Sequence, residues 1–446
     1  MSTNLGTSSL SSGSGIDVDT IVSNMVNAAR APERVWQNQQ LKLQSQQAAL
    51  NELSADLSAL DSSVSKLTDP LGAFNGFTSE SANNSVFTAS ATSGASAGQH
   101  SVVVTQLADK ASYYSNTVGS ISAAINGSIS IKVGATDATS IPIDSSTDTL
   151  DKLASAINQK NLGVTASIVT DAKGARLVLT GNNTGDTNNV VVTGTGSLSF
   201  TQSTSAQNAK LTIDGVPVES ASNTVSGALA GVTLNLQSAS KDTPVSLTVK
   251  QDTAGVTSAI NSFVNNYNTI IKAINTQFSY DATTNTAGAL SGDASVRALQ
   301  EQLLGQISYS STTTGNISTL AALGITMGDD GTLALDTTKL SAAVNSDFAN
   351  VKSFFQGDGT TGFASQFGVM MNGLTDSTTG SVIVDLQGNS DAQKTLTDQI
   401  SDFEVQIAFK RQQWLDQFSK VDAILRQFPL QQQQLTAELN SLSSLK

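Results

Sequence analysis

The sequence predicts an α+β multidomain protein. N- and C-terminal coiled-coil-like helices form a helical bundle stalk, and two nested β-rich head domains are inserted between them. Apolar residues recur at spacings of three and four near both ends of the 446-residue chain. Short stretches of alternating apolar and polar residues fill the middle. Helical spacing returns after Asp252, so the chain comes back to the bundle after the heads.

Two helices are predicted at the N-terminal end. Asp19 is the expected N-cap of the first, and Val22 and Met25 belong to its apolar face. Pro32 interrupts this pattern because proline lacks a backbone donor and disfavours helical geometry in the residue before it. We expect a break there and a second helix that begins at Pro32. The apolar seam of the second helix consists of Trp36, Leu43, Leu50, Leu53, Leu57, Leu60, Val64 and Leu67.

A matching seam lies near the C-terminus. Ser390 and Gln393 have the pattern of a capping box at the start of this helix, and Pro429 is expected to break it. So narrow an apolar stripe is typical of a helix that packs against partner helices. The seam residues are Leu396, Ile400, Phe403, Ile407, Trp414, Val421, Ile424 and Phe428.

Both seams weaken toward the outer ends of the helices. Each buried leucine contributes about 1.5–3 kcal/mol, so the uninterrupted seam at residues 50–67 offsets the entropy cost of ordering, whereas a diluted seam does not. We therefore expect residues 1–40 and 405–446 to be loosely ordered in an isolated subunit and to become helical only against other subunits. The polar residues that dilute the seams are Gln39, Gln46, Lys410 and Gln417.

Two nested β domains are predicted in the middle of the chain. Alternating residues around one amphipathic helix at 149–159 predict a ββαββ unit over residues 127–181. A second β region covers residues 211–249 with a turn at Asp214-Gly215, and a strand at 102–104 is expected to join it. One β domain is therefore inserted into the other.

Helical spacing after Asp252 predicts a long helix that fills the bundle. A shorter helix follows Asp293, then a hairpin at residues 323–335, and Asp336 caps the next helix. The predicted parts are an N-terminal leg (1–40), a helical bundle (41–70 and 251–404), an inner head (71–118 and 203–250), an outer head (119–202) and a C-terminal leg (405–446).

The composition excludes much catalytic chemistry. The chain has no cysteine and one histidine, which excludes disulfides, cysteine-ligated metal sites, thiol nucleophiles and histidine triads. An enzyme is the least supported class, and no cofactor or metal is expected. We interpret His100 as an ordinary surface residue, residues 329–331 as a turn, and Gly194 and Gly196 as loop residues.

Charge and hydropathy limit the partners. The net charge of −13 opposes binding of nucleic acid and anionic lipid, and residues 251–390 contribute −7 of it, from eleven acidic and four basic residues. No apolar stretch approaches the roughly 18–20 residues that cross a bilayer, so no membrane insertion is expected. Residues 1–15 lack the basic start and apolar run of a cleaved signal, so export would use another route.

Four regions resemble the bacterial flagellar filament cap family, also called hook-associated protein 2. Residues 15–32 resemble the family's N-terminal signature, and residues 127–181 resemble the flagellin hook IN motif. Residues 323–355 resemble its C-terminal region, as does the glutamine-rich last helix. These regions occur in the family's order over essentially the whole chain.

The resemblance implies a secreted protein that leaves the cell unfolded through the flagellar type III apparatus. It would form a ring, a pentamer in the family's pattern, at the tip of the growing flagellum. There it would promote flagellin insertion and prevent flagellin loss, and so support filament elongation and motility. The implied partners are further copies of the chain, flagellin, hook–filament junction proteins and an export chaperone. Val22, Met25 and the two seams would mediate bundle and subunit interactions.

Two alternatives remain open at this point. A flagellin or hook-junction component also joins terminal helices to a β head, although residues 1–15 lack the usual flagellin pattern. The kink at Pro32 and the residues at 323–340 favour the cap instead. The second alternative is a surface adhesin that uses the β-rich head for cell adhesion, and this role is compatible with capping.

Overall fold

The computed structural model describes residues 17–241, 243–283, 285–311 and 316–443. The chain divides into two compact units, which we describe separately. The first, which we call the helical unit, contains Met1–Ser65, Ile260–Leu340 and Ser353–Lys446. The second, which we call the β-rich unit, contains Lys66–Ala259 and Ser341–Lys352.

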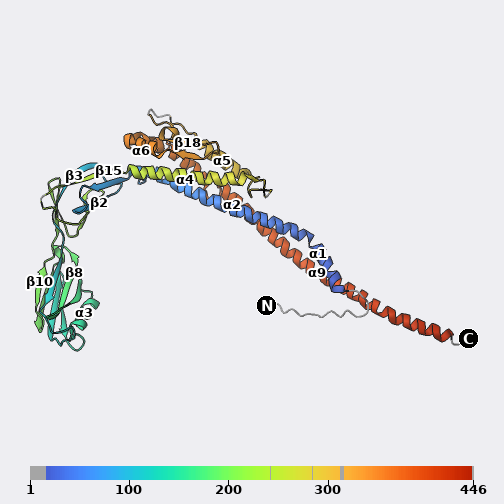
Figure 1. Cartoon of the computed structure of the whole chain (residues 1–446), viewed down its shortest axis with the longest axis horizontal. Helices are drawn as coiled ribbons and strands as arrows, with labels where there is room; N and C mark the ends of the chain where they lie inside the picture. Colours follow the sequence, from blue (N-terminus) through green and yellow to red (C-terminus); the bar gives the residue numbers. More distant parts are fainter. Residues whose placement is uncertain (1–16, 242, 284, 312–315, 444–446) are drawn as a thin grey trace. The chain divides into compact units, whose positions relative to one another are not determined.

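Most of the helices lie toward the two ends of the sequence, and most of the strands lie between Phe77 and Gln251 (Figure 1). The helices are α1 (Val18–Ala29), α2 (Ala31–Thr68), η1 (Ala73–Asn75), α3 (Leu150–Gln159), η2 (Asp186–Asn188), α4 (Thr253–Phe278), α5 (Ala294–Ile307), η3 (Leu320–Leu323), α6 (Thr337–Ser346), α7 (Phe348–Gln356), α8 (Phe363–Leu374) and α9 (Ser381–Ser443). The strands are β1 (Phe77–Ser81), β2 (Phe87–Ala91), β3 (Gly98–Gln106), β4 (Lys110–Ser115), β5 (Gly127–Val133), β6 (Thr139–Ile143), β7 (Val164–Asp171), β8 (Gly174–Thr184), β9 (Val190–Gly196), β10 (Phe200–Thr204), β11 (Ala209–Ile213), β12 (Val216–Ser220), β13 (Thr224–Leu229), β14 (Val232–Leu236), β15 (Val245–Gln251), β16 (Tyr280–Asp281), β17 (Thr286–Ala287), β18 (Ile325–Met327) and β19 (Leu333–Leu335).

The predicted break near Pro32 is confirmed. Helix α1 ends at Ala29, Arg30 is its C-cap, and α2 begins at Ala31 with Pro32 as its second residue. The predicted cap at Asp19 is wrong, because Asp17 takes that role: its carboxylate accepts hydrogen bonds from the Thr20 backbone N–H (3.1 Å) and hydroxyl (2.6 Å). The helix therefore begins at Val18, two residues earlier than a cap at Asp19 would give.

Two expectations for the C-terminal helix are wrong. Helix α9 begins at Ser381, so Ser390 lies inside it, and Gln393 donates to Asn389 Oδ1 (2.6 Å) within the helix. Pro429 also lies inside α9. Proline removes only one donor from the helix, and on this exposed stretch water can solvate the carbonyl that loses its partner.

The start of α9 is fixed by a turn that the chain uses twice. Oδ1 of Asp376 accepts hydrogen bonds from the backbone N–H and hydroxyl groups of both Thr378 and Thr379, at 2.7–2.9 Å. Asp358 does the same before α8, with Thr360 and Thr361. These hydrogen bonds favour the ionised carboxylates and hold the pKa of both groups well below the ordinary value of 3.8.

Acid is therefore expected to weaken the helical unit through these two turns. Because both folded-state pKa values are depressed, their stabilisation is fully present above about pH 4 and is lost as the pH falls through the lowered pKa values. Asp358→Asn combined with Asp376→Asn should lower the melting temperature at pH 7 and flatten its decline in acid, measured by calorimetry. Asp398→Asn, on an exposed part of α9, is the control. An unchanged acid profile would contradict the role of the turns.

An aromatic cluster forms the core of the helical unit. Phe263 on α4 makes edge-on contacts with Phe363 (ring centroids 5.6 Å apart) and Phe367 (5.2 Å) on α8. The predicted hairpin is confirmed as β18–β19, and Asn268 ties it to α4 by bonding both the N–H (2.6 Å) and the carbonyl (2.8 Å) of Leu333. The helix predicted after Asp252 and the shorter helix predicted after Asp293 are also confirmed, and Asp293 is the N-cap of the shorter helix.

Tyr267 carries an unsatisfied polar group in this core. Its side chain is fully buried beside Phe263, its hydroxyl has no hydrogen-bond partner among the described residues, and burial raises its pKa. We expect Tyr267→Phe to raise the free energy of unfolding by about 1 kcal/mol, because the desolvated hydroxyl is removed without a change of shape. Urea unfolding of both proteins tests this. A loss of stability would show that the hydroxyl has a partner.

The β-rich unit contains two hydrophobic cores. One lies between a five-stranded sheet, β1-β15-β3-β11-β12, and a three-stranded sheet, β13-β14-β2. The other lies between the sheets β10-β4-β8-β7 and β6-β5-β9 and is covered in part by α3. The ββαββ arrangement, the turn at Asp214-Gly215 and the pairing of the strand at 102–104 with both β11 and β15 are confirmed.

The expectation of a loop at Gly194 and Gly196 is wrong, because both lie in β9. A Cβ at Gly194 would come within 2.4 Å of the Leu198 carbonyl oxygen, so the close approach of the backbone requires glycine at this position.

Among the described residues, no helix combines the length and apolar character required to cross a bilayer.

Candidate assembly interface

Helix α1 packs along α9, where the two helices lie side by side (Figure 1). Val22, Val26 and Ile407 are the buried residues of this contact. The partly buried residues around them are Val18, Ala29, Phe403, Trp414, Leu415 and Phe418. The sequence pattern missed Phe418, which lies four residues after Trp414 and therefore on the same side of α9.

A charged clamp lies where α1 meets α2. Arg30 donates to both carboxylate oxygens of Glu404 (2.6 and 2.7 Å) and to Glu33 (2.7 Å), and Gln37 donates to the other Glu33 oxygen (2.9 Å). The hydrogen bonds from Arg30 lower the pKa of Glu404. Because a bidentate arginine–carboxylate pair has a fixed geometry, it sets the axial position of α1 and α2 on α9.

Helix α2 continues along α9 beyond this clamp. Trp36 contacts Phe403 edge-on, with ring centroids 5.3 Å apart. Gln40 donates to Thr397 Oγ1 (3.1 Å). The two tryptophans of the predicted seams therefore occupy different contacts: Trp36 packs on α9 and Trp414 joins the α1 cluster.

The structure places the predicted seam residues in three environments. The buried ones are Val22, Leu50, Leu53, Leu57, Leu60, Val64, Leu67, Leu396 and Ile407. The partly buried ones are Met25, Trp36, Leu43, Ile400, Phe403 and Trp414. The exposed ones are Val421, Ile424 and Phe428, with 46%, 57% and 61% of their surface exposed.

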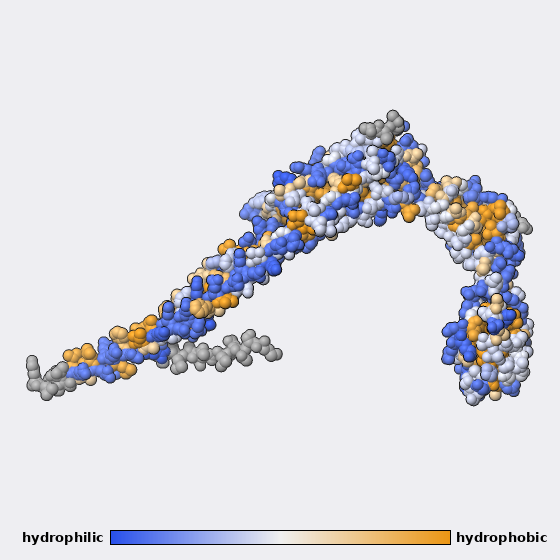
Figure 2. Space-filling model, turned by 180° about the vertical axis from the view of Figure 1, so that it is seen from behind, coloured by the Kyte–Doolittle hydropathy of each residue, from blue (hydrophilic) through white to orange (hydrophobic). Residues whose placement is uncertain are grey.

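The apolar pattern of α9 continues beyond the part of the helix that α1 contacts. Leu435 and Leu439 are also exposed, at 62% and 60%, and Leu435 follows Phe428 by seven residues, as the heptad predicts. Figure 2 shows hydrophobic residues on the surface of this last part of α9. We call Val421, Ile424, Phe428, Leu435 and Leu439 the tail stripe.

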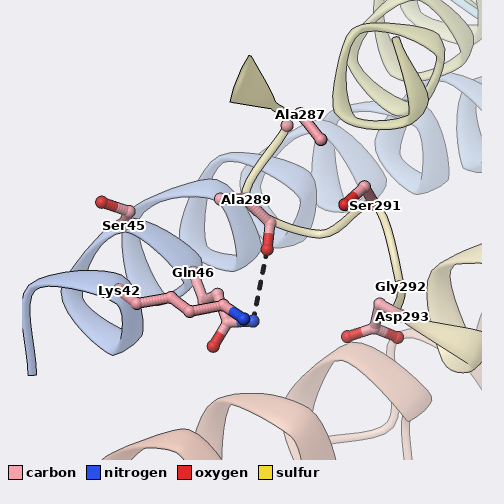
Figure 3. A pocket seen from close by; sticks show the side chains of 9 residues that line it. Lys42, Ser45, Gln46, Ala287, Ala289, Ser291, Gly292 and Asp293 are labelled. Carbon is pink, nitrogen blue, oxygen red and sulfur yellow. Dashed lines mark hydrogen bonds between the residues drawn. The ribbon is translucent and has the colours of Figure 1, made fainter. Parts of the chain in front are cut away.

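The hollow shown in Figure 3 is lined by polar side chains and by alanine and glycine residues. It has a volume of about 770 Å³ and lies between Lys42, Ser45 and Gln46 on α2 and residues 287–293. Gln46 donates to the Ala289 carbonyl (3.2 Å), so the polar side chain at this seam position fixes the loop that contains Ala289.

No group of three or more His, Cys, Asp or Glu residues that could hold a metal occurs within the described part of the chain. His100 pairs with Asp214 (2.7 Å).

Paired terminal helices, an apolar stripe left exposed at one end, and β domains inserted between them in the sequence are typical of a protein that assembles with other protein chains. Three family models match: "Flagellar hook-associated protein 2 N-terminus" at residues 14–111, "Flagellin hook IN motif" at 128–183, and "Flagellar hook-associated protein 2 C-terminus" at 206–429. The chain belongs to the flagellar hook-associated protein 2 family.

Similar proteins agree with this assignment. The B-type flagellar hook-associated protein 2 of Pseudomonas aeruginosa is 33% identical, and the match covers 96% of each chain. Flagellar hook-associated protein 2 of Escherichia coli K12 is 29% identical over 98% of this chain and 99% of the relative. The crystal structure of the D1-D2-D3 domains of the flagellar cap protein FliD from Escherichia coli matches 77% of this chain and 99% of that structure, with 30% identity and a TM-score of 0.60.

The resemblance to the cap family is thereby confirmed. The chain is a flagellar filament cap protein, exported and extracellular at the filament tip. The findings do not favour a flagellin, a hook-junction component or an adhesin. The relatives are structural flagellar proteins, and the cap oligomerises and sits on the flagellin filament.

The loose ordering of the outer segments in an isolated subunit stays a prediction. The packing of α9 suggests different behaviour for two parts of the C-terminal segment. One face of residues 403–418 is covered by α1, whereas residues 421–439 present the tail stripe to solvent. In hydrogen exchange on the monomer, we expect residues 421–440 to exchange much faster than residues 396–418, because an uncovered helix opens at little cost. Strong protection of residues 17–40 and 405–440 alike would contradict the prediction.

Proposed function

We propose that this chain promotes insertion of flagellin beneath the cap and prevents loss of unpolymerised flagellin. The tail stripe is the observation that supports this proposal most directly. Five large apolar side chains on one terminal helix are costly to leave in water, so their burial requires another protein surface. A cap that remains attached while subunits are added needs such a contact outside its own folded units.

We propose a role for each of the five parts predicted from the sequence. Residues 1–40 and 405–446 serve as legs, residues 41–70 and 251–404 as the bundle, and the inner and outer heads form the plate. The subunit contacts use Val22, Met25 and the two seams. We further propose a pentameric ring, an export chaperone before secretion, contact with hook–filament junction proteins, and no enzymatic activity.

Complementation tests the proposed activity. In a strain without the gene for this chain, the full-length protein should restore long filaments and motility and move flagellin from the medium into filaments. Cells with an empty vector are the control. Quantifying flagellin in the culture medium and in sheared filaments gives the result. If complemented cells release as much flagellin as the control cells, the proposal is wrong.

Mass measurement and negative-stain microscopy test the ring. A purified chain that forms closed rings with five times the mass of one subunit supports the proposed pentamer. Closed rings of another mass would contradict the proposed number of subunits but not the formation of a ring. A strict monomer that polymerises into long filaments contradicts the ring itself.

A further inference from the structure

Two short segments join the two cores of the β-rich unit: residues 107–109 after β3, and residues 205–208 before β11. They pair with each other, because the Asp109 N–H donates to the Gln207 carbonyl (3.0 Å) and the Gln207 N–H donates to the Asp109 carbonyl (3.1 Å). Gln207 Nε2 also donates to the Leu107 carbonyl (3.2 Å). A two-stranded connection of this length is only marginally stable by itself, so rigidity requires further contacts.

In the structure the inner head comprises β1–β3 and β11–β15, and the outer head comprises β4–β10 and α3, so β4 packs in the outer head although the sequence analysis assigned residues 110–115 to the inner one. The inner head holds the first segment through Asn223, in the loop between β12 and β13. The Ala108 N–H donates to Asn223 Oδ1 (2.7 Å), and Asn223 Nδ2 donates to the Ala108 carbonyl (2.9 Å). The side-chain amide therefore takes the place of a neighbouring strand and satisfies both backbone groups of Ala108. The Ala108 side chain is 5% exposed and belongs to the inner core.

The outer head holds both segments through the loop after β8. The Asp186 N–H donates to Asn208 Oδ1, and the Asn208 N–H donates to Asp186 Oδ1, each at 3.0 Å. The Gly185 N–H donates to the Asp109 carbonyl (3.3 Å). This loop therefore contacts the outgoing segment and the returning one together.

The loops from the two heads also contact each other. Thr184 Oγ1 donates to the Ala221 carbonyl (2.5 Å). Gly185 has a φ of +99°, and a Cβ on it would lie 2.6 Å from the Ala221 Cβ. Both the backbone conformation and the close approach require glycine here.

We propose that these contacts form a neck clamp (residues 107–109, 184–186, 205–208 and 221–223) that locks the two heads into one rigid body. Domains joined by short linkers move relative to one another by default unless their interface is extensive. Here side chains from both heads bond the linkers, and the heads bond each other. All of the contacts are within one chain, so the clamp acts in the free subunit and does not depend on the proposed capping activity.

The absence of cysteine allows a direct test in the full-length chain. Spin labels are attached at Ser226→Cys on β13 and Thr170→Cys on β7, both exposed positions, and their distance distribution is measured by pulsed electron paramagnetic resonance. We expect one narrow distribution. In the Asn208→Ala/Asn223→Ala variant, its width should increase about twofold, because the linkers regain the mobility usual between domains.

Two asparagines outside the neck clamp provide the matched control. Asn182 and Asn235 each accept one threonine hydroxyl within their own head, so Asn182→Ala/Asn235→Ala should leave the distribution narrow. Gly185→Ala is the second clamp variant. It forces the two loops apart without removing an amide, and it keeps the test valid if the double variant unfolds. A broad distribution in the unsubstituted chain would overturn the proposal, as would an unchanged width in the clamp variants that remain folded.

Discussion

Replacing Phe263 with alanine is expected to lower the free energy of unfolding of the helical unit by about 3–5 kcal/mol. The Phe263 ring is fully buried and contacts Tyr267, Phe363 and Phe367. Truncation therefore removes the transfer free energy of the ring and leaves a cavity that rigid neighbouring helices fill poorly. A loss of this size is a large part of the stability of a typical domain.

Phe278 on the same helix is the matched control for this prediction. It is half-buried and lies under the Arg297 guanidinium, 5.5 Å from its ring centroid. Phe278→Ala should cost about 1 kcal/mol, because less apolar area is lost and the exposed cation–π contact is weak. Calorimetry of the full chain measures both variants, with the unfolding of the heads as an internal reference. Similar losses for the two variants would contradict the assignment of Phe263 to the centre of the core.

Heptad spacing was a good predictor of the helices and of their buried inner seams. At residues 50–67 an apolar residue fills each seam position, so the helix period and the core coincide. The spacing does not determine which helix a seam contacts, because every seam of this kind repeats along its whole length. The axial position depends on Arg30 and Glu404, which are 374 residues apart in sequence.

Turn chemistry explains the errors at the helix ends. A capping-box pattern predicted a helix start at Ser390, but α9 begins at Ser381. The turn before it is held by Asp376, which accepts four hydrogen bonds from two threonines. Pro429 was expected to break the helix, yet on an exposed stretch the helix continues through it despite the loss of one donor. The neck clamp was also missed, because asparagines that bond a distant backbone leave no period in the sequence.

Substituting Val421, Ile424 and Phe428 with serine is expected to abolish filament growth and to leave the folded subunit intact. These side chains are 46–61% exposed, so the single chain gains little stability from them. In the assembled cap we propose that they are buried, and each apolar side chain then contributes about 1.5–3 kcal/mol. Three such losses would weaken the assembled contact by several orders of magnitude. Swimming in soft agar, filament length and flagellin in the medium give the result.

The control places the same three serines one residue earlier on the helix. Lys420→Ser/Ala423→Ser/Gln427→Ser has the same spacing and also changes exposed residues, but it leaves the tail stripe intact. Lysine, alanine and glutamine favour a helix more than serine does, whereas valine, isoleucine and phenylalanine are close to serine, so the control loses at least as much helix propensity as the stripe variant. Only the stripe variant removes large apolar surface. Equal motility of the two strains would show that the tail stripe makes no contact needed for capping. Loss of motility in the stripe strain alone, with an unchanged melting temperature of the monomer, would place the contact between protein chains.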